Sequence, residues 1–299
     1  MRAALSKMIG LERSQAEEAR RLAKGRLKAE HAKRAAFLEQ ARELMPYVSV
    51  AVGNDVFFVP TSDFRIGTRL FVRAGSKDML VLERALGHLA ELGHRLPAEP
   101  VFLDVGANLG TAATTALRHH GFSSAVALEP SPGNFKALKL GLVANELETR
   151  VQALQVAASD RADERVFDVS QPNSGDHRLL PEGAERPDQT VVVEVVTIDG
   201  LVSRGVIDPG RVGLVWVDTA GHEAHALAGG ARLLEAGIPI VTAIKHGWPE
   251  TEDALVELLT PYYTEVVDLR GSSSLRPIGE FRRLIDGLDR STDVLLVRR

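Results

Sequence analysis

Two apolar segments of this sequence end in polar residues whose types and spacing suit a small charged ligand. The segment Val101–Val105 carries an acidic residue near its end, and a turn rich in glycine and asparagine follows it. A second apolar segment, Ala125–Glu129, ends in a carboxylate about 20 residues after that turn. Neighbouring parallel strands place such groups at one sheet edge, where they hold a charged tail and a ribose. The pattern predicts a nucleotide-like ligand bound by Asp104, Gly106, Asn108, Gly110 and Glu129.

The turn discriminates between nucleotide-like cofactors. A dinucleotide site needs glycine where this sequence has Asn108 and again where it has Thr111. A P-loop is excluded because no Gly-Lys-Ser/Thr follows. S-adenosylmethionine has no phosphate and tolerates Asn108, and its ammonium group favours the carboxylate of Asp104. Its own carboxylate favours the N–H groups at the helix start, and its ribose hydroxyls can donate to Glu129. We therefore predict S-adenosylmethionine as the cofactor.

A methyl group on a sulfonium is already activated, so the protein must align the acceptor and remove its proton. His222 lies just beyond the segment Leu214–Asp218 on the ligand side of the sheet, and histidine has a suitable ordinary pKa. We take His222 and Asp218 as candidate catalytic residues, with helix capping as the structural alternative for each. No motif fixes a metal site here, and none is predicted. Weaker candidates for the acceptor pocket are Glu223, His246 and Trp248.

Alternating strands and helices must position these residues. From residue 101 onward, near-continuous apolar segments alternate with helical ones, which is typical of a sheet covered on both faces. Strands are expected at Val101–Val105, Ala125–Glu129, Val151–Ala157, Val191–Thr197, Leu214–Asp218, Ile238–Ile244, Thr264–Leu269 and Asp293–Val297. Helices are expected at Gly110–His119, Pro132–Asn145, Ala224–Ala236 and Thr251–Leu259. The segment Ser170–Gln189, with three Pro and two Gly, is expected to be a loop that shapes the substrate pocket.

The chain before this alternation divides at Pro46. Residues 1–46 hold eleven Lys and Arg against six Asp and Glu, a formal +5, while the whole chain carries −4 and the remainder therefore −9. Charge pairs at i,i+4 spacing predict one or two helices with a solvated face; an arm for homo-oligomers or another partner is the alternative. Residues 47–99 predict a β-hairpin within 47–73 and a helix at Met79–Leu92, and this region helps to close the pocket. Residues 100–299 form the main domain.

Composition excludes several classes. The chain has no cysteine, so disulfides, thiolate catalysis and Cys-ligated zinc are ruled out. The charged N-terminus lacks the apolar region of a signal peptide, and no apolar run is long enough to cross a bilayer. We expect a cytoplasmic protein with no membrane partner. The basic segment lacks aromatic stacking residues and the overall charge is negative, which argues against nucleic acid as a partner.

Several segments, taken in order, resemble the FkbM family of methyltransferases. The resemblance covers roughly Val101–Gly230, and the closing segment Asp293–Val297 is also similar. It implies a class I methyltransferase fold, with a mixed, mostly parallel seven-stranded sheet, and methylation of a hydroxyl on a sugar or another small natural product. By position it also implies that Ser159 and Asp160 border the adenine of the cofactor. The matching segments are Asp104-Val-Gly-Ala-Asn-Leu-Gly110, Leu128-Glu-Pro-Ser-Pro-Gly-Asn-Phe135, Asn145, Ala157-Ala-Ser-Asp160, Thr197-Ile-Asp199 and Val217-Asp-Thr-Ala-Gly-His-Glu223.

The sequence departs from the family at the acceptor end. The family's common Asp-Val-Glu-Gly-His-Glu stretch reads Asp218-Thr-Ala-Gly-His-Glu223 here, so Ala220 replaces a carboxylate. The later strand ends in Lys245-His246, where the family commonly has Glu. The main hypothesis is an O-methyltransferase acting on a small hydroxyl acceptor, which the resemblance suggests is glycosidic. The alternatives are a catalytically silent cofactor-binding module and an enzyme that methylates nitrogen or a macromolecule.

Overall fold

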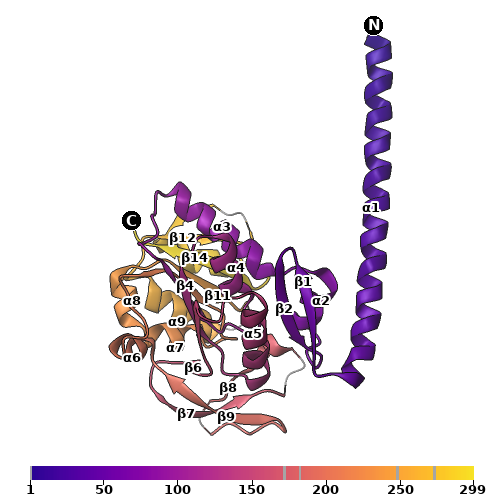
Figure 1. The fold of residues 1–299 in the computed structure, drawn as a ribbon. Coiled ribbons are helices and arrows are strands. Elements are labelled where there is room, and N and C mark those ends of the chain that lie inside the picture. Colours follow the sequence, from indigo (N-terminus) through magenta and orange to yellow (C-terminus); the bar gives the residue numbers. More distant parts are fainter. Residues whose placement is uncertain (1, 171–172, 182, 247–248, 272–273) are drawn as a thin grey trace.

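The computed structural model describes residues 2–170, 173–181, 183–246, 249–271 and 274–299 of the protein. Figure 1 shows an α/β body, a small two-stranded layer beside it and one long helix that stands apart. The body contains an eight-stranded sheet in the order β13-β12-β14-β11-β10-β3-β4-β5. Its strands are β3 (Val101–Val105), β4 (Ser124–Leu128), β5 (Val151–Leu154), β10 (Val212–Val217), β11 (Ile240–Ile244), β12 (Glu265–Asp268), β13 (Leu275–Pro277) and β14 (Thr292–Val297).

Strand direction identifies the architecture. β3, β4, β5, β10 and β11 are parallel, whereas β14 runs antiparallel to both of its neighbours, β11 and β12. Every residue of β3, β10, β11 and β14 is buried, as expected of strands covered on both faces. This confirms the class I methyltransferase fold. The sheet has one strand more than expected, because the short strand β13 extends its edge.

Helices cover both faces of the sheet. Alternate residues of β3 point to opposite faces, so Phe102 packs in one apolar layer and Leu103 in the other. The first layer is covered by α3 (Lys77–Glu91), α4 (Thr111–His119) and α5 (Pro132–Ala144). The second is covered by α6 (Ile198–Ser203), α7 (Glu223–Ala228), α8 (Ala231–Ala236), α9 (Pro249–Leu259) and α10 (Phe281–Asp286).

Two of the expected elements are divided in the structure. The helix expected at Ala224–Ala236 is two helices, because Gly229 lies against the carbonyl of Ser159, where a Cβ would collide with that backbone. The strand expected at Val151–Ala157 separates into β5 and β6 (Ala157–Ala158).

A second sheet explains the divided strand. The segment expected to be a strand at Val191–Thr197 is β9 (Thr190–Val196), and it lies in this separate sheet, which has the order β6-β9-β7-β8. Its remaining strands are β7 (Asp163–Asp168) and β8 (Arg178–Leu179). The segment expected to be the loop Ser170–Gln189 carries β8 and the short helix η1 (Ser174–Asp176) among its described residues.

The two-stranded layer is β1 (Tyr47–Val52) and β2 (Asp55–Pro60), followed by α2 (Ile66–Arg73). The predicted hairpin is therefore confirmed, but it ends at residue 60 and a helix follows. Buried Asp55 fixes the layer to the body because its carboxylate binds Arg118 and His119 of α4. Asn145 also holds β2, since its side chain accepts from the N–H of Val56 and donates to its carbonyl.

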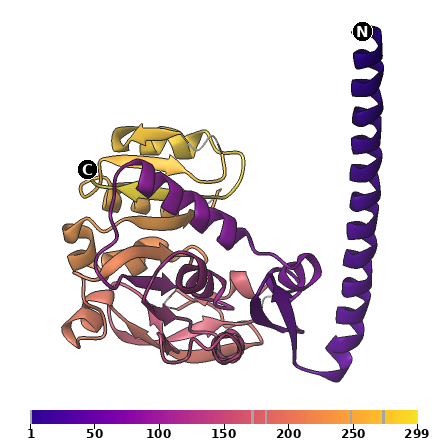
Figure 2. The same ribbon diagram turned by 45° about the horizontal axis from the view of Figure 1, so that its top comes forward.

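The N-terminal segment forms one helix, α1 (Arg2–Leu44). Near its C-terminal end, Leu38 and Ala41 are buried against the hairpin and α2, and Arg42 donates to the carbonyl of Thr61. Residues 17–30 are exposed. Figure 2 shows the hairpin and α2 between this helix and the body. An oligomerisation role for α1 stays a prediction.

Among the described residues, none of the helices has both the length and the apolar character that a membrane span requires. Within the same part of the chain, no three or more His, Cys, Asp or Glu side chains are arranged so that they could hold a metal ion.

Candidate active site

Two adjoining cavities lie at the carboxyl ends of the parallel strands. The first cavity has a volume of about 520 Å³ and is lined by residues that follow β3, β4 and β10, together with Phe167, His177 and Leu179 of the second sheet. The second cavity, about 1480 Å³, opens between these strand ends and the helices α2 and α3. Both volumes include open solvent. The cavities meet at a shared wall made by Gly106, Asn108, Gly175 and Asp218.

The turn between β3 and α4 forms part of this wall. Gly106 has φ +85°, and a Cβ at this position would collide with the carbonyl oxygen of Asp218. Gly110 has φ +77° and lies against the side chain of Leu138. Asn108 also adopts a left-handed conformation, with φ +50°, which asparagine tolerates better than most residues. The turn therefore needs these residue types to adopt its left-handed conformations and to pack closely against Asp218 and Leu138.

Glu129 is buried at the end of β4 and lines the first cavity. Its Oε2 accepts from the N–H of Asn108 at 2.8 Å, and its Oε1 accepts from the N–H of Ser131 at 2.9 Å and the amide of Asn134 at 3.4 Å. Burial raises the pKa of Glu129 to about 7, although these three donors oppose the shift. The carboxylate is thus held in one orientation and keeps acceptor capacity for a ligand's hydroxyl groups.

Asp104 is completely buried in β3 and borders the second cavity. Its Oδ2 accepts from the N–H of Ala113 at 3.1 Å, whereas its Oδ1 has no partner within the described part of the chain. Burial raises the pKa of Asp104 to about 8. The Oδ1 of Asn108 and the Oγ1 of Thr219, on the walls of the same cavities, are also without described partners. Such buried atoms call for a polar ligand.

His222 lies at the first cavity and not at the second. Its Nε2 is 2.9 Å from the hydroxyl of Ser159, and its ring stacks on His225 with centroids 4.7 Å apart. Because the Ser159 hydroxyl donates to Asp160, the imidazole Nε2 is left to donate to Ser159. Burial, aided by the charge of His225, lowers the pKa of His222 to about 4. The ring is thus neutral and held toward Ser159, and the role of His222 as the base stays a prediction.

The predicted adenine contacts Ser159 and Asp160 lie beside this histidine. Ser159 is completely buried and Asp160 is about half exposed, and neither borders the first cavity. The preceding residues, Ala157 and Ala158, line it instead. The segment that carries Ser159 and Asp160 therefore lies near the first cavity. Its two polar side chains hold His222 in place and do not line the cavity.

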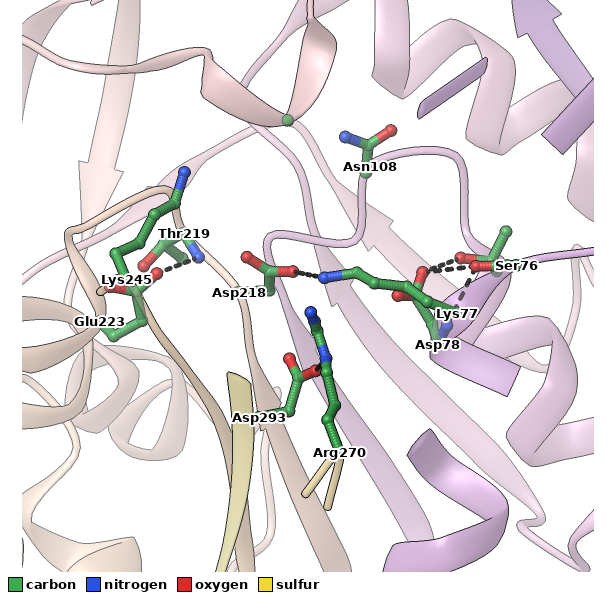
Figure 3. Close-up of polar contacts among 12 residues, drawn as sticks. Ser76, Lys77, Asp78, Asn108, Asp218, Thr219, Glu223, Lys245, Arg270 and Asp293 are labelled. Atoms are coloured by element: carbon green, nitrogen blue, oxygen red, sulfur yellow. Dashed lines mark hydrogen bonds and ion pairs between the residues drawn. The ribbon is translucent and has the colours of Figure 1, made fainter. Parts of the chain in front are cut away.

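Asp218 is the predicted catalytic residue that borders both cavities. Its N–H donates to the carbonyl of Val105 at 3.0 Å, which fixes it beside the turn after β3. Its Oδ2 lies 3.4 Å from the ammonium of Lys77, the first residue of α3 (Figure 3). Burial acts to lower the pKa of Lys77, but the charges of Asp218, Asp293 and Asp78 outweigh it and raise that pKa. The cation therefore stays charged next to Asp218.

The loop after Asp218 is supported from behind by Glu223. This carboxylate is completely buried and accepts from the N–H groups of Thr219 and Gly221, at 2.9 and 3.1 Å. Burial and the charge of Asp218 raise the pKa of Glu223 to about 7. It borders neither cavity, so it supports the loop and is not placed to contact the acceptor.

Ala220 lies in the same loop, with φ +55°. It borders the first cavity and not the second. The carboxylate that the family commonly has here is thus missing from the cofactor side of the wall.

The remaining residues predicted to contact the acceptor are His246 and Trp248. His246 is exposed and borders neither cavity; its N–H donates to the hydroxyl of Ser291 at 3.2 Å. Trp248 lies outside the described residues. The neighbouring Lys245 does line the second cavity, where its ammonium is 3.0 Å from Asp176.

Sequence reasoning missed several residues of the second cavity. Lys77 and Arg270 line it from distant segments, and Figure 3 shows them grouped around Asp218 together with Asp293. Arg270 is paired with buried Asp293. One available signal was Ser76-Lys77-Asp78, because a serine that caps a helix places the following residues at a helix start, and Ser76 does accept from the N–H of Asp78.

Comparison with known proteins gives a family match. The family model for the methyltransferase FkbM domain matches residues 104–270. No curated protein sequence matches the chain.

Solved structures with related folds include M. jannaschii TYW2 in complex with AdoMet, with TM-score 0.42 and 9% identity, covering 85% of this chain and 87% of that one. The B. subtilis M1A22 tRNA methyltransferase TrmK gives TM-score 0.39 and 16% identity, with coverage of 70% and 64%. A precorrin-6y C5,15-methyltransferase from Geobacter metallireducens gives TM-score 0.40 and 12% identity, with coverage of 74% and 86%.

Proposed function

We propose that this chain, which belongs to the methyltransferase FkbM family, methylates a hydroxyl group of a small molecule such as a sugar or another natural product. The family model covers more than half of the chain, so the protein is an S-adenosylmethionine-dependent methyltransferase. The nature of the acceptor is the part that we infer.

The residues of the two cavities fit the cofactor. The unpartnered oxygen of Asp104 suits an ammonium group, and glycine at position 106 lets the turn pack against the carbonyl of Asp218 in the shared wall. Glu129 would hold the ribose hydroxyls, and the apolar side chains of Phe167 and Leu179 in the first cavity suit the purine ring. When bound, S-adenosylmethionine supplies an activated methyl group. The remaining task of the protein is to orient the acceptor and take its proton.

The position of Asp218 at both cavities is the observation that supports a hydroxyl acceptor. Its carboxylate borders both cavities, so it is exposed to an acceptor in the second cavity and lies beside the cofactor residues. A hydroxyl that gains a methyl group must lose its proton, and a carboxylate at this position can accept it. The ammonium of Lys77, 3.4 Å from Asp218, would stabilise negative charge that develops on the acceptor oxygen.

The test combines cofactor binding with turnover. Binding of S-adenosylmethionine is measured by calorimetry, and methyl transfer is then measured against sugars, other hydroxylated natural products, amines and tRNA. We expect transfer to a hydroxyl. The variant Asp218→Asn should lower kcat by roughly 10²- to 10⁴-fold and change the Kd for the cofactor by less than about threefold.

Two further variants make this test specific. Asp289→Asn changes an almost fully exposed carboxylate, and its kcat should equal that of the wild type. His222→Gln tests the alternative base: if it abolishes transfer while Asp218→Asn does not, our assignment is wrong. Transfer only to amines or to tRNA would replace the hydroxyl proposal. Cofactor binding with no transfer to any member of the panel would favour the silent binding module.

A further inference from the structure

The second cavity is lined by five cationic side chains and by four carboxyl groups, those of Asp78, Asp104, Asp176 and Asp218. Three of these cations are paired with aspartates. Lys77 lies 3.4 Å from Asp218, Lys245 lies 3.0 Å from Asp176, and Arg270 is paired with Asp293. These pairs leave little net charge on the floor of the cavity.

Two arginines on the opposite wall differ from these cations. Arg65 precedes α2 and Arg69 lies one turn further along, and both line the second cavity. Among the described residues, neither guanidinium makes a side-chain hydrogen bond or an ion pair. Burial acts to raise the pKa of Asp176. Hydrogen bonds from Asn173 and Lys245, and then the charges of Lys245 and Arg65, outweigh burial and lower that pKa. The positive field of α2 is thus felt inside the cavity.

The wall that carries these arginines is held firmly. Buried Asp63 accepts from the N–H groups of Arg65 and Gly67, at 2.7 and 2.9 Å, so the start of α2 has its amide partners. The same carboxylate accepts from the hydroxyl of Ser174, which lines the first cavity. Since these two backbone donors are satisfied and both arginines line the cavity, a ligand would meet the two guanidinium groups. Arginine side chains bind phosphate and carboxylate groups with paired, charge-assisted hydrogen bonds.

We propose that the acceptor carries an anionic group, a phosphate or a carboxylate, which Arg65 and Arg69 bind while its hydroxyl faces Asp218. This inference rests on the proposed function, because it assigns the part of the second cavity between α2 and Asp218 to the acceptor and leaves Asp104 to the cofactor. It narrows the substrate class to hydroxylated small molecules with a negative charge, such as a sugar phosphate or a uronic acid. The anionic group lies toward α2 and the reacting hydroxyl toward the shared wall.

The first experiment measures anion binding without catalysis. Inorganic pyrophosphate is titrated by calorimetry into the full chain loaded with S-adenosylmethionine, at low salt because exposed charges are screened. The double variant Arg65→Gln/Arg69→Gln should weaken binding by about tenfold or more, since each charged hydrogen bond contributes substantially. Arg73→Gln is the matched control: this arginine ends the same helix and is exposed, but it does not line the cavity. Its affinity should stay within about twofold of the wild type.

The second experiment uses acceptors that differ only in charge. A hexose, the same hexose bearing a phosphate and the corresponding hexuronic acid are compared in methyl transfer. We expect a charged member to have the lowest KM, and the double variant to raise that KM roughly tenfold with kcat for a neutral acceptor unchanged. Which charged acceptor is preferred distinguishes phosphate from carboxylate.

Each outcome separates the two proposals. Equal pyrophosphate affinity in the wild type and the double variant, or an equal loss in Arg73→Gln, overturns the anion site. Efficient transfer to the neutral hexose alone, unaffected by the double variant, also overturns it and leaves the proposed function intact. Pyrophosphate binding through Arg65 and Arg69 with no transfer to any acceptor refutes the proposed function and not the anion site.

Discussion

The substitution Gly106→Ala tests whether the two cavities form one functional cleft. Gly106 has φ +85°, where an alanine costs roughly 1–2 kcal/mol relative to glycine. The new Cβ would collide with the carbonyl oxygen of Asp218 and lie 2.9 Å from its carbonyl carbon. Ordinary contacts begin at 3.4 Å and the carbonyl oxygen is closer still, so the backbone after β10 must move by roughly 1 Å. The strain and the forced movement together predict a destabilisation of roughly 2–4 kcal/mol.

The same movement should impair the cofactor site more than the fold. Thr219, whose Cγ2 lies 3.3 Å from the built Cβ, would shift with Asp218, and both border the first cavity. We expect the Kd for S-adenosylmethionine to rise by at least about tenfold in Gly106→Ala, measured by calorimetry. Urea unfolding followed by circular dichroism should show the loss of stability.

A second glycine provides the control for this prediction. Gly87 lies within α3, and a Cβ there meets no atom within 4 Å. Gly87→Ala should stabilise the protein slightly, by up to about 1 kcal/mol, because alanine is the better helix former, and cofactor affinity should not change. If Gly106→Ala binds S-adenosylmethionine as tightly as the wild type, the close approach of the turn to Asp218 is not what shapes the cofactor site.

Three further predictions concern charge and the N-terminal helix. Asp104 keeps its proton in the folded state up to about pH 8, whereas the unfolded chain loses this proton near pH 4. Between these two pH values, each unit of rising pH therefore lowers the free energy of unfolding by up to about 1.4 kcal/mol. Asp104→Asn should therefore flatten the fall in stability between pH 5 and 8, measured by urea unfolding, and an unchanged slope would contradict this. Asp55→Ala leaves Arg118 and His119 without their carboxylate and should cost about 2–3 kcal/mol by the same method, against no loss for exposed Asp289→Ala. If α1 joins copies of the chain, removing residues 2–30 should lower the number of copies per particle measured by light scattering, and an unchanged number would refute that role.

The cofactor end of the site could be predicted because its determinants are local in the sequence. Asp104, Gly106 and Asn108 belong to one strand and the turn that follows, and such a turn has a recognisable composition. Glu129 follows in the next strand, and the N–H of Asn108 donates to it. Parallel pairing of β3 with β4 then brings these groups to one edge with no further information.

The acceptor end could not be predicted in this way because its contacts join distant segments. Lys77 and Asp218 are 141 residues apart, and Arg270, which follows β12, reaches Asp293 at the start of the neighbouring strand β14. The spacing of residues also could not show to which side of a strand end His222 turns. Its partner, Ser159, follows β6 in the second sheet, and that sheet itself was not expected.

These two ends of the site also differ in their relation to the family. The matched region, residues 104–270, contains Asp104, Glu129 and Asp218, which we assign to the cofactor and the chemistry. The matched region does not contain Arg65, Arg69 or Lys77, which line the second cavity near α2 and α3. It also ends before Thr292, another residue that lines this cavity. Family membership therefore carries over the reaction and leaves the acceptor open. Because Arg65, Arg69 and Lys77 lie before the matched region, variants of α2 and α3 are the direct way to identify the acceptor.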